Sequence, residues 1–208
     1  MNWDSVYESR AALLPIATLN SRRHIKNLHR LALCEDKDLW FEDECHFLQH
    51  GSRCAMWITP EDADPIVWQA PTRKIVAFFG AVCEKDGRLV TQKGTSFNAD
   101  SFGTFSSCLL RHHRRGIKMI VIVDNARWHH ACKLEPWLRD HKSKIQIDFL
   151  PSYSPELNVI ERVWKLTRTL CTHNQYFNLL DGLIDSVQNQ FENWRKPNHV
   201  LKRLCVII

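Results

Sequence analysis

The chain has 208 residues, of which 44% are hydrophobic and 25% are charged, and its formal net charge is +5 at pH 7. This composition is ordinary for a globular protein with one well-buried core. No apolar run approaches the roughly 20 residues that a membrane-spanning helix needs, and the first residues lack the pattern of a signal peptide. We therefore expect a cytoplasmic protein that does not enter a membrane.

Eight cysteines are scattered along the chain without any C-x-x-C pair, and the eleven histidines show no ligand spacing with them. Several cysteines lie inside apolar segments, as Cys83 does. The pattern predicts buried free thiols in a reducing compartment and argues against disulfides and structural zinc.

Basic residues gather in two places. One cluster lies in the first thirty residues and the other before Gly116, and their main members are Arg22, Arg23, Lys26 and Arg30, then Arg111, Arg114 and Arg115. Clusters of this kind suit contacts with the phosphates of nucleic acid, although a solvated helix face is the commoner explanation for any single one. Together with an acidic metal site they favour a nucleic-acid enzyme.

The first segment, residues 1–37, is predicted to be a basic helical extension or linker. Ser21 is suited to cap a helix, and Ile25, Leu28 and Ala32 form an apolar stripe with helical spacing. The segment is too short for an independent domain. Residues 38–208 are expected to form one domain.

Strand patterns dominate the first half of that domain. In the first strand, Leu39, Phe41 and Asp43 share one face, whereas Glu42 and Glu44 point to the other face and are not assigned as ligands. Further strands are predicted at 55–58, 74–83 and 88–91, with a turn at Asp86-Gly87 before the last of these.

Helices and strands alternate in the second half. The patterns predict helices near 100–113 and around Ala131, Leu134 and Leu138. Two more helices are predicted, one opened by the Ser154 cap and the first-turn Pro155 and one at 179–194. Strands are predicted at 119–123 and 145–150. This order fits an α/β protein with a mixed five-stranded sheet and helices on both faces, the layout of the ribonuclease H-like fold. By analogy with that fold, the first and fourth strands are adjacent, which would place Asp43 beside Asp124.

Three carboxylates stand in positions that suit a metal site. Asp43 and Asp124 each close an apolar strand, and Glu161 lies in the first turns of a helix. Hard divalent cations favour such oxygen donors, and a pair of cations can activate water and stabilise a pentacoordinate phosphate. Each acid also has an ordinary explanation: a turn for Asp43, a helix cap for Asp124 and an i,i+4 pair with Lys165 for Glu161.

Several neighbours are weaker candidates for supporting roles. Asn125 adjoins Asp124, and Asn158 lies three residues before Glu161 and could orient its carboxylate or a water, or simply bond within the helix's first turn. His129 could contact DNA phosphate or support the metal shell, and a packed histidine is an equal alternative. The tryptophans at 57, 128 and 164 are predicted to be core anchors.

Three strings carry a resemblance to a known family. Phe-Glu-Asp-Glu at 41–44, Asp-Asn-Ala-Arg-Trp-His-His-Ala at 124–131 and Leu-Pro-Ser-Tyr-Ser-Pro-Glu-Leu-Asn-Val-Ile-Glu-Arg-Val-Trp at 150–164 resemble transposases of the mariner type, in their bacterial insertion-sequence branch. Thirty-six residues lie between Asp124 and Glu161, close to the family's usual interval. The family usually has proline where Val159 stands.

The resemblance implies a ribonuclease H-like domain whose aspartate-aspartate-glutamate triad is Asp43, Asp124 and Glu161. It further implies two Mg²⁺ ions, replaceable by Mn²⁺, held by these three acids. The implied activity is cleavage of double-stranded DNA at transposon ends, then attack of the freed 3′-hydroxyl on target DNA at TA dinucleotides. A homodimer assembled on the DNA, near the bacterial nucleoid, is the implied working form.

The resemblance also leaves other functions open. The helix-turn-helix domains that recognise transposon ends are absent or reduced to the basic extension, so an upstream helix-turn-helix polypeptide is an expected partner. One rival function is a truncated, non-catalytic protein that regulates a full-length transposase. The other is a nuclease of the ribonuclease H type that cuts RNA–DNA hybrids.

Overall fold

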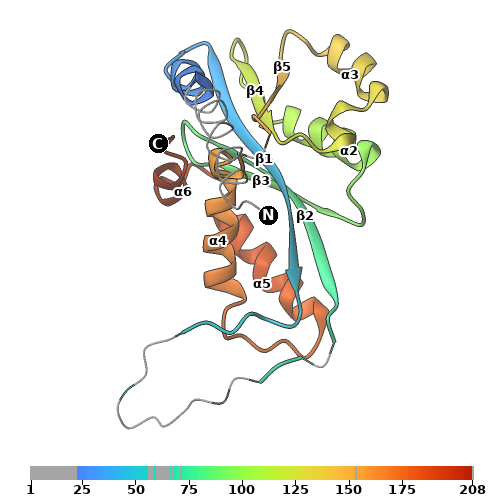
Figure 1. Ribbon diagram of the computed structural model, residues 1–208, viewed down its shortest axis with the longest axis vertical. Coiled ribbons are helices and arrows are strands. Elements are labelled where there is room, and N and C mark those ends of the chain that lie inside the picture. The colour runs from blue at the N-terminus through green and yellow to red at the C-terminus, as the bar shows by residue number, and fades with distance from the viewer. Residues whose placement is uncertain are drawn as a thin grey trace, which may run out of the picture.

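A computed structural model describes residues 23–55, 59, 66, 68–70, 72–152 and 154–207. One mixed sheet of five strands, in the order β3-β2-β1-β4-β5, forms its centre (Figure 1). The strands are β1 (Lys37–Leu48), β2 (Ile75–Cys83), β3 (Leu89–Gly94), β4 (Lys118–Val123) and β5 (Ile145–Phe149). β1 is antiparallel to β2 and parallel to β4, and the expected mixed five-stranded sheet is confirmed.

Helices cover both faces of the sheet (Figure 1). Leu39 and Phe41 of β1 belong to the core shared with α4 (Ile160–Cys171), α5 (Leu180–Asn193) and α6 (His199–Leu204). Trp40 belongs to the opposite core, shared with α2 (Ala99–Leu110) and flanked by α3 (Glu135–Asp140). This division follows from the strand's two-residue period, because successive side chains point to opposite faces.

The pairing of β1 with β4 fixes the position of two of the acids. The parallel register runs from Lys37 opposite Lys118 to Phe41 opposite Ile122. β4 then ends at Val123, whereas β1 continues to Leu48 along β2. Asp43 comes two residues after the last β1–β4 pair and Asp124 directly after β4, so both reach the same end of the β1–β4 pair.

The helix expected around Ala131 to Leu138 is instead three short pieces. They are the 3₁₀ turns η1 (Arg127–His130) and η2 (Cys132–Leu134), followed by α3. Pro136 sits in the first turn of α3. Ala131 between η1 and η2 has extended backbone, and Pro136 has no backbone N–H to continue a helical ladder from η2, so one continuous helix does not form.

The sequence predicts that Ser154 and Pro155 open the next α-helix, but in the structure they do not. Pro155 begins the 3₁₀ turn η3 (Pro155–Leu157), and α4 starts only at Ile160, with Val159 in the N-cap position. Asn158 between them has extended backbone, with ψ of 96°. The extended residue separates η3 from α4 and lies three residues before Glu161.

Other expectations fall partly outside the described residues. Of the strand predicted at 55–58, only Ala55 is described, and it is not in a strand. Ser21, Arg22, Trp57 and Tyr153 are likewise outside the described residues. Residues 23–32 are helical, and Leu28 is fully buried, as its stripe predicted. The sequence did not indicate α6.

All eight cysteines are free, and four of them, Cys45, Cys83, Cys171 and Cys205, are buried, in agreement with the expected thiols. Among the described residues, no helix has the length and apolarity needed to cross a membrane.

Gly80 of β2 gives the closest packing near the acids. It pairs with Asp43 across the β1–β2 ladder, and the Trp164 ring of α4 lies over it. A Cβ at this position would come within 2.3 Å of Trp164 Cη2. The ring cannot easily move, since Trp164 is 1% exposed and packs edge-on against Phe47 and Phe191. Glycine is therefore required for the close approach of α4 to the sheet.

The first prediction concerns this contact. Gly80→Ala should destabilise the protein by about 1–3 kcal/mol, because an added methyl group overpacks a rigid site. Gly182→Ala in the first turn of α5 is the control, since its Cβ would meet nothing nearer than 3.7 Å. That variant should be neutral or more stable by up to about 1 kcal/mol. Urea denaturation of both variants measures the difference, and equal stabilities would contradict the packing argument.

Candidate functional site

A pocket of about 470 Å³ opens where β1 leaves β4, and the three predicted acids line it together. Asp43 comes from β1, Asp124 from the end of β4 and Glu161 from the first turn of α4. Two of the three predicted supporting residues, Asn125 and Asn158, also line the pocket. The structure thus brings together five side chains that the sequence spreads over nearly 120 residues.

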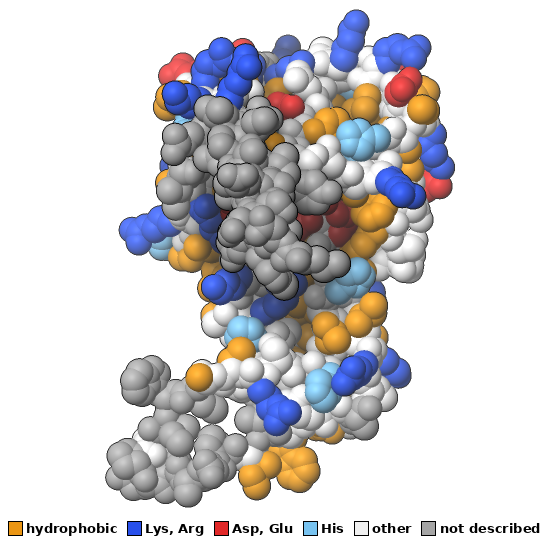
Figure 2. Space-filling model, in the orientation of Figure 1, with side chains coloured by type: hydrophobic (Ala, Val, Ile, Leu, Met, Phe, Trp, Pro, Cys, Tyr) orange, Lys and Arg blue, Asp and Glu red, His pale blue; other side chains and the backbone are white. Residues whose placement is uncertain are grey.

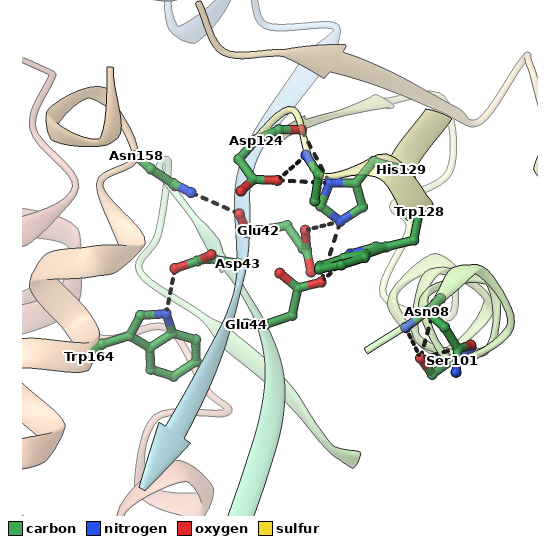
Figure 3. Close-up of polar contacts among 11 residues, drawn as sticks. Glu42, Asp43, Glu44, Asn98, Ser101, Asp124, Trp128, His129, Asn158 and Trp164 are labelled. Atoms are coloured by element: carbon green, nitrogen blue, oxygen red, sulfur yellow. Dashed lines mark hydrogen bonds and ion pairs between the residues drawn. The ribbon is translucent and has the colours of Figure 1, made fainter. Parts of the chain in front are cut away.

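Asp43 is the most enclosed of the three acids. Its side chain lies on the face of β1 that packs against α4, and Trp164 Nε1 donates a hydrogen bond of 3.1 Å to its Oδ2 atom (Figure 3). Burial and the nearby charge of Glu161 raise the pKa of Asp43 to about 7. Both causes disfavour the charged form of Asp43, the first because it removes water and the second because Glu161 carries a like charge.

Asp124 is held differently, although half of its side chain surface is exposed. Its Oδ1 atom accepts a hydrogen bond of 2.8 Å from the Ala126 N–H and lies 3.0 Å from His129 Nδ1. The hydrogen bond with His129 is the main cause that lowers the pKa of Asp124. The carboxylate bonds to the backbone that follows it but does not cap η1, whose N-cap residue is Ala126 and which has no side-chain cap, and it lines the pocket.

Glu161 is exposed at the second position of α4. A carboxylate in the first turn is favoured by the partial positive charge of a helix N-terminus. No ion pair joins it to Lys165 in the described part of the chain, so the surface-pair alternative has no support. The helix start positions its carboxylate at the pocket.

The two asparagines tie the pocket wall together. Asn158 is buried, and its Nδ2 donates a 2.9 Å hydrogen bond to the backbone carbonyl of Glu42 in β1. This bond links the loop before α4 to β1. Asn125 Nδ2 donates to the Leu150 carbonyl at the end of β5. Both side chains therefore brace the segments that carry the acids.

His129 is buried behind the pocket, as the packed alternative predicted. Its Nδ1 atom faces Asp124, and its Nε2 atom lies 3.4 Å from Glu44 and 3.6 Å from Glu42. Burial by itself would lower the pKa of His129, but the bond with Asp124 and the nearby carboxylates of Glu44 and Glu42 raise it to about 10. His129 does not line the pocket, so it is not placed to contact DNA phosphate there.

Glu42, Glu44 and Trp164 have closer links to the site than the sequence indicated. Glu42 and Glu44 do lie on the opposite face of β1 from Asp43, as expected from strand alternation (Figure 3). Their contact with His129 depends on the path of η1, which no sequence pattern showed. Trp164 is the core anchor that was predicted, and it also donates to Asp43. The sequence signal for this contact was that Trp164 lies three residues after Glu161, which puts both side chains on the same side of a helix.

The first basic cluster lies next to the pocket. Arg23, Lys26 and Arg30 are exposed on the helix of residues 23–32 and line a groove that ends at Pro151. Pro151 also lines the acidic pocket. Figure 2 shows basic side chains grouped at the upper left, where Figure 1 places this helix. The groove and the pocket are neighbours.

The second basic cluster is at the other end of β4. Arg114 pairs with Asp38, a buried residue at the start of β1, and Arg111 Nη2 contacts Cys108 Sγ. Arg115 follows in the turn before β4. Because the pocket opens beyond the opposite end of that strand, the structure does not bring Arg111, Arg114 and Arg115 to the acids. The cation of Arg114 neutralises a buried carboxylate, which is the reason for its position.

Comparisons with known proteins agree with this geometry. A family model described as DDE superfamily endonuclease matches residues 38–184. An uncharacterized 39 kDa protein of the insertion element IS630 from Shigella sonnei is 26% identical over 113 residues, which are 54% of this chain and 33% of that protein. The resemblance to transposases of the mariner and insertion-sequence type is confirmed.

Solved structures show the same fold. A Mos1 mariner paired-end complex with Mn matches with a TM-score of 0.66 and 14% identity, over 91% of this chain and 57% of that chain. The catalytic domain of Mos1 transposase matches with a TM-score of 0.55 and 14% identity, over 91% and 88% of the two chains. The ribonuclease H-like fold is confirmed. The chain spans about a third of the IS630 protein and about half of the Mos1 chain in the complex.

The second prediction uses the raised pKa of Asp43. The folded protein holds this proton up to about pH 7, whereas the unfolded chain releases it near the ordinary value of 3.8. Between these values the folded state binds more protons, so the contribution of Asp43 to stability falls as pH rises. In EDTA, the difference between the unfolding free energies of Asp43→Asn and the wild type should therefore increase in favour of the variant from about pH 4 to about pH 7. Urea denaturation at several pH values measures both free energies. A difference that stays constant with pH would contradict the prediction.

Proposed function

Because the chain belongs to the DDE superfamily endonucleases, we propose that it is the catalytic domain of a transposase. Its proposed reactions are cleavage of DNA at transposon ends and transfer of the freed 3′-hydroxyl to target DNA. One observation carries the proposal: Asp43, Asp124 and Glu161 line a single pocket at the end of the β1–β4 pair. We assign these three residues as the catalytic acids.

The pocket suits divalent cations. Its acids offer only carboxylate oxygens, the donors that Mg²⁺ and Mn²⁺ prefer. Burial and the charge of Glu161 both raise the pKa of Asp43, and a bound cation would favour its charged form. We propose that Asp43, Asp124 and Glu161 hold two Mg²⁺ ions, which Mn²⁺ can replace. When bound, such ions activate water and stabilise the charge on a phosphodiester in displacement at phosphorus.

The protein's own contribution is to hold the acids in place. Trp164 fixes one oxygen of Asp43, and His129 with the Ala126 N–H fixes one oxygen of Asp124. The Asn158 bond to β1 and the start of α4 position Glu161 relative to Asp43. Ligands that are already ordered lose little conformational entropy when the substrate binds.

DNA must be held against three negative side chains. The groove of Arg23, Lys26 and Arg30 lies beside the pocket and shares Pro151 with it. We propose that a DNA strand leaves the acids along this groove, with its phosphates on the three cations. Arg22 lies outside the described residues and remains a proposed DNA-binding residue.

The remaining assignments are also proposals. Residues 1–37 act as a linker that carries the basic helix, and residues 38–208 are the catalytic domain. A helix-turn-helix polypeptide supplies recognition of the transposon ends, and two copies of the chain act together on DNA. This chain matches 33% of the IS630 relative and 57% of the Mos1 chain.

The third prediction tests the catalytic acids. Asp43→Asn, Asp124→Asn and Glu161→Gln should each abolish nicking of supercoiled DNA in Mg²⁺ or Mn²⁺, because each removes a ligand charge at nearly constant volume. Glu192→Gln at the end of α5 is the control for loss of a carboxylate and should retain wild-type nicking.

The outcomes separate the rival functions. Strong nicking by any of the three variants would refute the assignment. Cleavage of RNA–DNA hybrid without strand transfer would favour a ribonuclease. A folded wild-type chain that binds DNA without cleaving it would favour the regulatory protein.

The fourth prediction concerns the groove. Binding of the chain to DNA should be weak and indifferent to sequence, and log K should fall linearly with log salt concentration. Changing Arg23, Lys26 and Arg30 together to Gln should reduce that slope by about 1–3, since each phosphate contact contributes about 0.9. Arg111→Gln with Arg115→Gln is the control and should leave the slope unchanged. A reduced slope for the Arg111 and Arg115 variant, with an unchanged slope for the triple variant, would place DNA at the other end of β4.

A further inference from the structure

A second group of ligand-type side chains lies behind the catalytic strand. Glu42 and Glu44 occupy alternate positions of β1, on the face opposite Asp43, and His129 reaches toward both (Figure 3). One ligand atom from each of the three residues lies within 4.8 Å of the other two. The group is outside the pocket of Asp43, Asp124 and Glu161.

Polar atoms of this group lack the partners that buried atoms normally have. Glu42 is fully buried, and neither of its carboxylate oxygens makes a hydrogen bond. His129 is 3% exposed, and its Nε2 atom makes none either. Burying a carboxylate without hydrogen bonds is costly, and here the unsatisfied atoms face one another. A cation between them would satisfy all of them.

The separations fit metal ligands better than hydrogen bonds. His129 Nε2 is 3.6 Å from Glu42 Oε2 and 3.4 Å from Glu44 Oε1. An N–H···O hydrogen bond spans about 2.7–3.2 Å. Two ligands of a tetrahedral Zn²⁺, each bonded at about 2.0–2.1 Å, lie about 3.4 Å apart. Small side-chain movements would complete such a geometry.

The surrounding bonds also suit a metal ligand. The other ring nitrogen of His129 faces Asp124 at 3.0 Å, the carboxylate–histidine–metal arrangement that orients an imidazole toward its ion. Trp128 Nε1 donates a 2.8 Å hydrogen bond to Glu44 and fixes that carboxylate. A divalent cation would balance the negative charges of Glu42 and Glu44. His129 Nδ1 would keep its bond to Asp124 while Nε2 binds the cation.

We propose that Glu42, Glu44 and His129 bind one divalent transition-metal cation, with Zn²⁺ as the expected ion. An imidazole nitrogen beside two carboxylates suits Zn²⁺, whereas the catalytic pocket offers oxygen atoms alone. The ion has a structural role: it holds η1 against β1 and, through His129, orients Asp124. This site is separate from the proposed function, which stands or falls on the pocket acids.

The experiment measures metal binding by the full 208-residue chain, with exposed Cys54 and Cys132 changed to Ser to remove stray thiol ligands. The protein is stripped with a chelator and titrated with Zn²⁺, or with Co²⁺ as a coloured probe, in excess Mg²⁺. We expect one tightly bound Zn²⁺ per chain and a Co²⁺ absorption spectrum of a site with a nitrogen ligand. Zn²⁺ should also raise the melting temperature.

Matched variants locate the ion. Glu42→Gln and His129→Gln should remove the bound Zn²⁺ and the Co²⁺ spectrum, whereas Glu161→Gln in the pocket should keep both. Asp124→Asn should weaken binding by about 10–100-fold, as expected for a residue that orients a ligand. Glu42→Gln is nearly isosteric, so it should fold, which circular dichroism verifies.

Two results would overturn the site. In the first, the stripped wild type binds Zn²⁺ no more tightly than Glu42→Gln does. The two glutamates would then be neutralised by a proton on His129 and not by a metal ion. If Glu161→Gln removes the ion and Glu42→Gln retains it, the ion belongs to the catalytic pocket. Neither result depends on DNA cleavage.

Discussion

The parallel pairing of β1 with β4 is the constraint on which the rest of the site depends. It ends at Phe41 and Ile122, one residue before β4 itself ends, while β1 continues beside β2. Backbone pairing thus stops just short of Asp43 and Asp124, and a pocket opens there between the strands and α4. The ends of adjacent parallel strands are where open α/β sheets commonly bind ligands. Glu161 joins the two aspartates because α4 packs on the face of β1 that carries Asp43.

Aromatic side chains then set the orientation of the two aspartates from opposite sides of the sheet. Trp164 approaches Asp43 over the bare backbone of Gly80, and His129 approaches Asp124 from the core that contains Phe102. Each ring is buried and holds one oxygen of its aspartate. Packing of the two cores is therefore coupled to the geometry of the acids. A substitution that loosens either core disturbs the site without touching an acid.

Much of this arrangement could be predicted from local patterns in the sequence. The apolar run at 119–123 indicated a central strand, and the alternation of Leu39, Phe41 and Asp43 indicated which face the first acid takes. The break before α4 could not be predicted in this way, because Asn158 leaves the helix to bond with the Glu42 carbonyl, a contact across 116 residues. The role of Arg114 was missed for the same kind of reason, since it depends on Asp38 in a distant strand. Motifs identified the acids, whereas their bracing depends on tertiary contacts.

Strand alternation has one further consequence for charge. Three successive acids in β1 are divided by the sheet, with Asp43 on one face and Glu42 and Glu44 on the other. The front face places its carboxylate in a pocket with Asp124 and Glu161, and the back face buries its carboxylates against His129. Asp124 contacts both groups, since it lines the pocket and bonds to His129. One imidazole ring, that of His129, therefore connects the charges behind β1 to the pocket in front of it through its contact with Asp124.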